Sequence, residues 1–577
     1  MSHLLSISLG PVQDFIASAR RTRDFWFGSE LLSRLARAAA QAVAESSGGL
    51  DSLIFPAPRS AEELERLGVA NKILAVVEDP ARAAHLARAA VLEELRSEYR
   101  VAEKDVAGQP FYDAEAARLQ IEDLPEIYWA AVEQTGDYPA DRARVEALLA
   151  ARKNTRDFSP VTWGSDRPKA SLDGLRESVL DLSALSDRQR ESWAHRLGVR
   201  PGEILCAVSL LKRRGARGEE GSAFASVAHV TAGPLLDRLR LEDKPRVQEF
   251  QMELRSLLPG GGDLDRVPQA HQVFGPYDGH ILFAERLEED FGERTADAQA
   301  ALARFLKDLR LPAPQPYYAL LHADGDRMGA ALEAQKTPDQ HRRLSRALAG
   351  FADGAGEIIR EHGGLAVYLG GDDVLAFLPL HRALHCATAL AQDFAYRLAG
   401  FPSPKGAPTL SVGIAVCHQM EPLGDALNLA RKMEKLAKKD RNCLAVAVDR
   451  RSGSPVQVVG AWTESPRTPL HGRLLEWAHL LRSEALPQGV AYELRQLVLS
   501  LGEESPELVA REAGRILSRK QTERGRGGKL DKTVMKALLG EGLPAWKIGE
   551  VANEILVARS IADAFQVAGQ PILEVQH

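Results

Sequence analysis

The chain has 577 residues, of which 45% are hydrophobic and 26% are charged, and its formal net charge is −6. This length predicts several domains, and the composition is ordinary for a soluble globular protein. The acidic balance argues against a protein that binds nucleic acid alone over a broad basic surface. Any nucleic-acid contact is therefore expected to be local, or shared with partner subunits.

Four scattered cysteines argue against structural zinc and suit reduced thiols in a cytosol, because none has CxxC spacing. They are Cys206, Cys386, Cys417 and Cys443. No apolar run approaches the about 20 residues of a membrane span, and the N-terminus lacks the pattern of a secretory signal. We therefore expect a cytoplasmic protein without membrane contact.

The first part of the chain predicts a small sheet surrounded by helices. Apolar runs at Leu4–Leu9, Lys72–Glu78 and Ile127–Val132 predict strands. Gly10-Pro11 closes the first strand, and the residues from about 100 to 200 are otherwise mainly helical and polar.

Three segments are rich in basic residues. Arg20, Arg21 and Arg23 precede an aromatic run and form either a solvated helix end or a phosphate contact. Lys212–Arg217 follows a predicted strand at Pro201–Leu211 and predicts a mobile surface loop. The segment 519–532 predicts a flexible loop, with nucleic-acid contact as the alternative.

Helices are expected up to about residue 310, interrupted by a linker at 260–262. Pro312, Pro314 and Pro316 then block a helix and indicate a domain boundary. Elements alternate after this boundary: strand 317–323, helix 339–362, hairpin 365–380, helix 381–399, strand 409–416, helix 424–439 and strand 443–448. This order predicts an α/β (α+β) sheet with antiparallel strands and helices packed on it.

Four acidic residues lie at predicted strand ends of this region. Gly370 and Gly371 separate two apolar runs and predict a tight turn, with Asp372 and Asp373 at its tip. Adjacent buried carboxylates need a positive partner, usually a hard cation with oxygen ligands. Upstream, the strand at 317–321 leads to Asp324 and Asp326, whose side chains share a face of an extended chain. These carboxylates are predicted to converge on one or two divalent ions.

Helices are expected again from Ser452 onward. They are predicted at Leu470–Ser483, Ala491–Leu501, Pro506–Ser518, Lys532–Leu539 and Trp546–Phe565.

The order strand, DxD, helix, GGDD hairpin, helix, strand, helix resembles the palm of GGDEF proteins and adenylyl cyclases. Ser411–Ala415 is similar to the S-hydrophobic-G-hydrophobic strand of that fold, and Ala437–Asn442 to its AK-xx-GRN helix end, with Asp440 where glycine is usual. The segments at 10–33, 159–174 and 436–453 are similar to the large subunit of type III-B CRISPR effector (Cmr) complexes. The resemblance spans nearly the whole chain.

The resemblance implies two ferredoxin-like nucleotidyl-cyclase palms plus helical domains. The expected units are a degenerate first palm at 1–240 with a helical insertion at about 85–200, a helical linker at 241–311, the GGDD palm at 312–455 and a helical bundle at 456–577. It also implies guide and target RNA, other Cmr subunits including a small helical one, and conversion of ATP into cyclic oligoadenylates. No His-Asp dipeptide occurs, so no HD-type DNase is expected.

We expect Asp324 and Asp373 to be the main ligands of two Mg²⁺ or Mn²⁺ ions, with Asp372 and Asp326 assisting. The predicted catalytic residues are Asp324, Asp372 and Asp373. Around them, the residues predicted to contact ATP are Gly370, Gly371, Asp326, Lys438, Arg441 and Ser411.

Several of these assignments have structural alternatives. Asp326 fits a turn or helix-cap role, Lys438 and Arg441 fit solvated charges, and Ser411 fits a small strand residue. His322 and His362 flank the site and are expected to be packed or surface histidines. For the whole chain, the alternatives are a nucleotide-binding scaffold without turnover, a GGDEF-type dinucleotide cyclase and a template-dependent polymerase.

Overall fold

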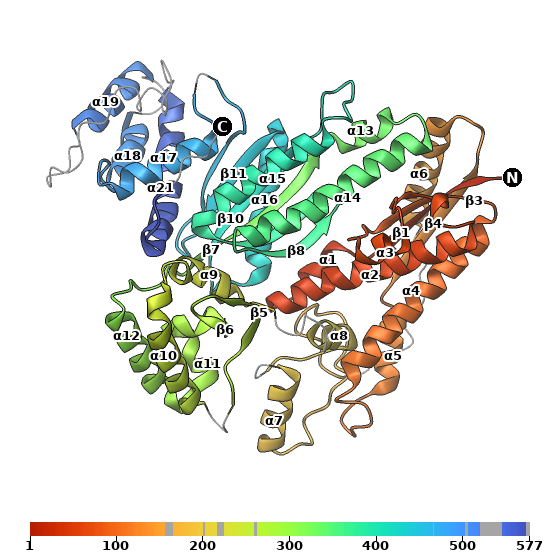
Figure 1. Cartoon of the computed structure of the whole chain (residues 1–577), viewed down its shortest axis with the longest axis horizontal. Helices are drawn as coiled ribbons and strands as arrows, with labels where there is room; N and C mark the ends of the chain where they lie inside the picture. The colour runs from red at the N-terminus through yellow and green to blue at the C-terminus, as the bar shows by residue number, and fades with distance from the viewer. Residues whose placement is uncertain are drawn as a thin grey trace.

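The computed structural model contains two large β-sheets of four and six strands, helices that cover them, and two further helical units (Figure 1). The structure describes residues 1–155, 166–199, 202–215, 224–258, 262–465, 467–501, 506–519 and 545–572. This mixture of sheets and helices confirms the predicted fold class. Within the described residues, no helix is long and apolar enough to cross a membrane.

The first sheet has the strand order β2-β3-β1-β4, and every neighbouring pair is antiparallel. Its strands are β1 (His3–Gly10), β2 (Leu53–Phe55), β3 (Lys72–Val77) and β4 (Glu126–Glu133). The helices of this part are α1 (Gln13–Ala17), α2 (Thr22–Ser46), α3 (Ala61–Arg66), α4 (Pro80–Glu103), α5 (Ala114–Glu122) and α6 (Tyr138–Asn154). The three predicted strands are confirmed, and β2 is an addition.

The second sheet has the order β12-β11-β10-β7-β9-β8, in which only the β10–β11 pair is parallel. Its strands are β7 (Tyr317–Asp326), β8 (Leu365–Gly370), β9 (Asp373–Pro379), β10 (Thr409–His418), β11 (Cys443–Val448) and β12 (Val456–Ala461). Its helices are α13 (Met328–Ala334), α14 (Pro338–Glu361), α15 (Ala383–Leu398) and α16 (Leu423–Asp440). The predicted order is confirmed, but β12 corrects the expectation of helices directly after Ser452.

Strand alternation in β7 gives the second sheet two different faces. Ala319 and Leu321 point into a core formed with α14 and α15. Tyr318 and Leu320 point the other way, into a core shared with Phe25 of α2 and with α16. The first sheet's helices therefore pack on the second sheet's open face.

Helix α14 also joins the two sheets, and it crosses between them in Figure 1. Arg342 donates to the carbonyl oxygens of Asp51 (2.6 Å) and Leu53 (2.8 Å), next to and within β2. His341 Nδ1 lies 2.6 Å from the Tyr138 hydroxyl at the start of α6. These bonds fix the second sheet's helix layer against the first sheet.

Two helical units complete the chain. One has its own core, with helices α9 (Val227–Leu236), α10 (Lys244–Leu257), α11 (Leu287–Phe291) and α12 (Thr295–Asp308) and a hairpin of β5 (Arg266–His271) and β6 (Gly275–Tyr277) that the sequence did not predict. The other contains α17 (Leu470–Arg482), α18 (Val490–Leu501), α19 (Pro506–Arg519) and α21 (Ala545–Ala568). The helix predicted at Lys532–Leu539 lies outside the described residues, as does most of the basic segment 519–532.

The prediction for residues 201–217 was wrong. Within it, the structure has a helix, α8 (Ala207–Arg214), and buries its three basic residues. Lys212 donates to the carbonyl oxygens of Phe15 and of Ser18 (2.6 Å), and Arg213 binds both carboxylate oxygens of Asp24 at 2.7 and 2.8 Å. A short apolar run does not distinguish a buried strand from a buried helix, and these partners are far away in the sequence.

Candidate active site

Three carboxylates meet at one end of the second sheet. Asp324 near the end of β7 pairs directly with Asp373 at the start of β9. Asp372 lies in the turn between β8 and β9, and its carbonyl oxygen accepts a hydrogen bond from Gly325 N at 3.0 Å. A Cβ atom on Gly325 would lie 2.8 Å from the Asp372 Cβ atom, so only glycine permits this close approach.

The hairpin tip differs from the prediction by one residue. Gly370 is the last residue of β8 and pairs with Asp373, so the turn consists of Gly371 and Asp372. Gly371 has a φ of +78°, which a glycine at the first central position of a hairpin turn adopts readily. Gly370 is required for another reason, because a Cβ atom there would overlap the ring of Tyr368.

The carboxylates repel one another. Burial and the charge of Asp324 raise the pKa of Asp372 to about 7. Burial, Asp324 and Asp372 raise the pKa of Asp373 to about 8. The side chains of Asp324 and Asp373 are still about one third exposed, at 33% and 32%, and Asp373 Oδ1 lacks a hydrogen-bond partner. Carboxylate oxygens that repel one another, one of them without a hydrogen-bond partner, are suitable ligands for a hard divalent cation.

Lys438 on α16 supplies the nearest positive charge. Its Nζ donates to Asp324 Oδ2 and lies 3.3 Å from the Gly325 carbonyl oxygen. Burial lowers the pKa of Lys438, but the hydrogen bond and charge of Asp324 outweigh this effect and raise it overall. Among the described residues, no three His, Cys, Asp or Glu side chains are arranged so that they could hold a metal ion as they stand. Asp324 is instead paired with Lys438.

Asp326 has a different environment from the other three acids. It is 2% exposed and accepts hydrogen bonds from the Thr409 hydroxyl, the Ser411 hydroxyl and the backbone N–H of Asn442, each at 2.8 Å. Both carboxylate oxygens are therefore used within the protein. Asp326 ties β7 to β10 and to the end of α16, as a positioning residue. Ser411, predicted to contact ATP, points at Asp326.

A hollow of about 390 Å³ opens beside these carboxylates. Both acidic and basic side chains line it. The lining consists of Asp324, Gly325, Asp326, Arg327, Met328, Gly329, Asp372, Lys438 and Arg441. Gly370, Gly371, Asp373 and Ser411 are not among the lining residues. A volume of this size is typical of a small-molecule site.

Two arginines of this hollow have unusual backbone conformations. Arg327 has a φ of 62° and a ψ of 18°, and Arg441 has a φ of 60° and a ψ of 162°. The second combination is almost restricted to glycine and costs of order 1–3 kcal/mol elsewhere. Such strain gathers at functional sites. Arg441 was predicted to contact ATP, whereas no pattern in the sequence indicated that Arg327 would line the same hollow.

Three further side chains lie next to the carboxylates: His322, which the sequence placed beside the site without a role, and Glu434 and Tyr368, which it did not single out. His322 Nε2 lies 3.4 Å from Asp373 Oδ1, and burial lowers the pKa of His322 to about 4. Glu434 on α16 lies 3.9 Å from both His322 and Lys438. Burial and the nearby acids Asp373, Asp372 and Asp324 raise the pKa of Tyr368. The spacings of His322 to Asp324 along a strand and Glu434 to Lys438 along a helix could have indicated the first two.

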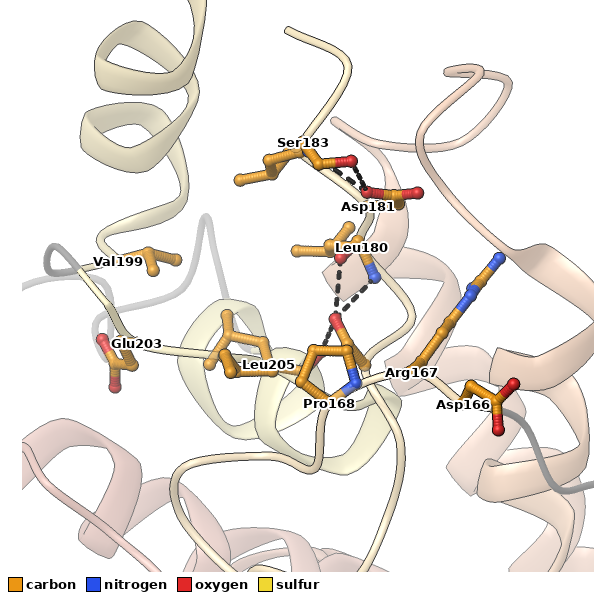
Figure 2. A pocket seen from close by; sticks show the side chains of 12 residues that line it. Asp166, Arg167, Pro168, Leu180, Asp181, Ser183, Val199, Glu203 and Leu205 are labelled. Carbon is orange, nitrogen blue, oxygen red and sulfur yellow. Dashed lines mark hydrogen bonds between the residues drawn. The ribbon is translucent and has the colours of Figure 1, made fainter. Parts of the chain in front are cut away.

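A second hollow of about 530 Å³ lies in the region between α6 and α8. Figure 2 shows hydrogen bonds within the loop that lines it, including those between Ser183 and Asp181. Ser178 Oγ donates to the Leu180 carbonyl oxygen at 2.7 Å, and Ser183 Oγ donates to Asp181 at 2.6 Å. Because these polar groups serve the local loops, the hollow does not present a convergent set of groups for chemistry.

Two protein-family models match parts of this chain. The model of the Cas10/Cmr2 second palm domain matches residues 317–445, and the model of the N-terminal part of CRISPR-associated protein Cmr2 matches residues 4–116. The CRISPR system Cmr subunit Cmr2 of Pyrococcus furiosus is 22% identical over 78% of this chain and 62% of its own length. The chain thus spans about three fifths of that relative.

Two solved structures are similar in fold. The type III-B Cmr-beta complex in its apo state gives a TM-score of 0.64 at 13% identity, covering 96% of this chain and 81% of the matched chain. The type III-B Cmr-beta complex bound to cognate target RNA gives 0.68 at 12% identity, covering 96% and 83%. At these identities the likeness concerns the fold.

Proposed function

We propose that the chain is a member of the Cas10/Cmr2 family and the large subunit of an RNA-guided type III-B complex that converts ATP into cyclic oligoadenylates. One observation carries the catalytic part of this proposal. Asp324, Asp372 and Asp373 lie together beside a hollow, which Asp324 and Asp372 line with Arg327, Lys438 and Arg441. Carboxylates beside cations are what a nucleoside triphosphate and its metal ions require.

The carboxylates supply the metal-binding side of the reaction. Divalent Mg²⁺ or Mn²⁺ held there would activate a ribose hydroxyl and neutralise the leaving pyrophosphate. Asp324 and Asp373 are the proposed main ligands because their side chains are accessible. To bind a metal ion, Asp324 would have to release Lys438, with which it is paired in this structure. Asp326 keeps the strand and the end of α16 in register for this exchange.

The cationic residues hold the triphosphate. Arg441 and Arg327 line the hollow together with Asp372, so phosphate oxygens fit between them and the acids. Lys438, once released from Asp324, becomes a further phosphate contact. Guanidinium groups bind phosphate oxygens in a fixed fork geometry, which positions the reacting phosphorus atom.

The partners are proposed on the family and the fold. The family resemblance implies a guide RNA, a target RNA, other Cmr subunits and a small helical subunit. The structural neighbour bound to cognate target RNA supports an RNA partner. Target RNA is proposed to switch the activity on, and ATP is the expected substrate.

The test combines binding and turnover. The full chain is titrated with ATP and Mn²⁺, and the assembled complex with target RNA is incubated with each labelled nucleoside triphosphate. We expect metal-dependent, ATP-selective binding and cyclic adenylate products, both lost in Asp372→Ala/Asp373→Ala. A matched control is Asp440→Ala, an exposed acid at the end of α16. ATP binding without product would favour the scaffold, and cyclic dinucleotides of guanine would favour a GGDEF-type cyclase.

A further inference from the structure

His322 is a buried histidine that the proposed reaction leaves without a role. It lies two residues before Asp324 on β7, on the same face of the strand, and its side chain is 15% exposed. Its imidazole stands between two acids, with Nε2 3.4 Å from Asp373 Oδ1 and Nδ1 3.9 Å from Glu434 Oε2. Neither distance is that of a good hydrogen bond.

Two atoms at this contact are buried without partners. His322 Nδ1 and Asp373 Oδ1 are inaccessible and make no hydrogen bond in the structure. Buried polar atoms without partners are rare, and each calls for an explanation. The Asp373 side chain nevertheless remains 32% exposed, so its accessible surface does not come from Oδ1. Oδ1 therefore faces His322, and the exposed surface belongs to the rest of the Asp373 side chain.

We propose that His322 is a positioning residue, whose Nε2–H bonds to Asp373 Oδ1 when the site is loaded and thereby aims Oδ2 at the metal. This inference rests on the proposed metal-dependent function. A neutral imidazole carries one N–H, and Asp373 lies closer to it than Glu434 does. Hydrogen bonds of this kind often tighten only in the loaded site. A partner behind a ligating carboxylate fixes the ligand's orientation, and its loss typically lowers metal affinity 10- to 100-fold.

The test measures Mn²⁺ binding to the full chain by electron paramagnetic resonance, without nucleotide. His322→Gln places an amide N–H near the position of Nε2, whereas His322→Asn places it near Nδ1. We expect the Mn²⁺ dissociation constant to rise about 10- to 100-fold in His322→Ala and His322→Asn, and to stay within about threefold in His322→Gln. His362→Ala is the matched control, because His362 caps α14 by bonding Ile358.

Three outcomes decide the proposal. Weakened Mn²⁺ binding with rescue by glutamine supports it. Dissociation constants within about twofold of wild type in all three His322 variants, with binding lost in Asp373→Ala, overturn it and leave the proposed function intact. If the wild-type chain binds no Mn²⁺, the metal site and this role fail together. Thermal unfolding shows which variants fold. If His322→Ala does not fold, the comparison of Mn²⁺ binding by His322→Asn and His322→Gln tests the proposal.

Discussion

The two palms of this chain share one backbone plan but differ at the strand ends that carry the candidate site. The strand order β2-β3-β1-β4 of the first matches β8-β9-β7-β10 of the second. The same backbone bond closes both: Leu9 N donates to the Asn71 carbonyl oxygen at 2.8 Å, and Gly325 N donates to that of Asp372 at 3.0 Å. The frame is thus common to both palms.

The side chains on this frame are reversed in charge. Ser8 faces Lys72 in the first palm, where Asp324 faces Asp373 in the second. Lys72 pairs with Glu146 on α6, whereas Asp324 pairs with Lys438 on the corresponding helix α16. The first palm therefore carries a base on its strand and an acid on its helix. The two palms therefore differ in a few residues at their strand ends and share their strand order.

The largest expected effect tests how closely the helix packs on each sheet. Gly413 on β10 faces His322, as Ala130 on β4 faces Ser6. A Cβ atom on Gly413 would lie 2.1 Å from Glu434 N. Gly413→Ala is expected to destabilise the protein by about 3 kcal/mol through overpacking, as a lowered urea midpoint. The matched change Ala130→Gly is expected to lower the stability by only about 1 kcal/mol. Equal losses of stability in the two variants would contradict a closer approach of α16 to β10 than of α6 to β4.

The next effect is a pH dependence that the acids of the second palm cause. The pKa values of Asp372 and Asp373 are raised to about 7 and about 8, so the folded state holds protons that the unfolded state releases. The contribution of these two acids to stability is greatest below pH 4 and is lost as the pH rises through 8. Allowing for solvent screening of the partly exposed Asp373, we expect a loss of about 2 kcal/mol, measured by urea unfolding in a chelator.

Asp372→Asn/Asp373→Asn is expected to flatten this profile. An unchanged slope in the variant would show that other groups cause it. Lys72→Asn serves as the control, because its end of the first palm has no cluster of acids.

A smaller effect concerns backbone strain. In residues 1–155, only glycines have positive φ angles, whereas Arg327, Arg441 and Asn442 have them beside the site. Arg441→Gly is expected to stabilise the protein by about 1 kcal/mol and to weaken ATP binding. Arg441→Lys keeps the strain and the charge and serves as the control. A glycine variant that is no more stable would show that the surroundings compensate the strain.

The smallest effect tests the charge reversal in the first palm. Lys72 and Glu146 are each 38% exposed, so their pair is expected to contribute at most about 1 kcal/mol. A double-mutant cycle with Lys72→Ala and Glu146→Ala measures this coupling free energy. A coupling free energy above about 2 kcal/mol would mean that this pair stabilises the first palm more than an exposed ion pair normally does.

The sequence was sufficient where the signal was local. The apolar runs around Gly371 and Asp372 predicted the hairpin, and the strand before Asp324 predicted its partner. It failed where distant contacts decide the structure. Lys212 was predicted to lie in a surface loop, but it donates to the carbonyl oxygens of Phe15 and Ser18, which are distant in the sequence. Arg327 and His322 likewise acquire meaning only from the neighbours that folding gives them.

The shared core has a practical consequence for dividing this protein. Tyr318 and Leu320 of β7 pack in one cluster with Phe25 of the first palm, and Arg342 satisfies first-palm carbonyl groups. A fragment that begins at the proline-rich boundary would present this apolar strand face to water and would leave the arginine without its acceptors. Expression of residues 312–455 alone is expected to give aggregates, whereas a nicked chain with both halves retained should stay assembled. The domain boundary in the sequence is therefore not a place to cut the molecule.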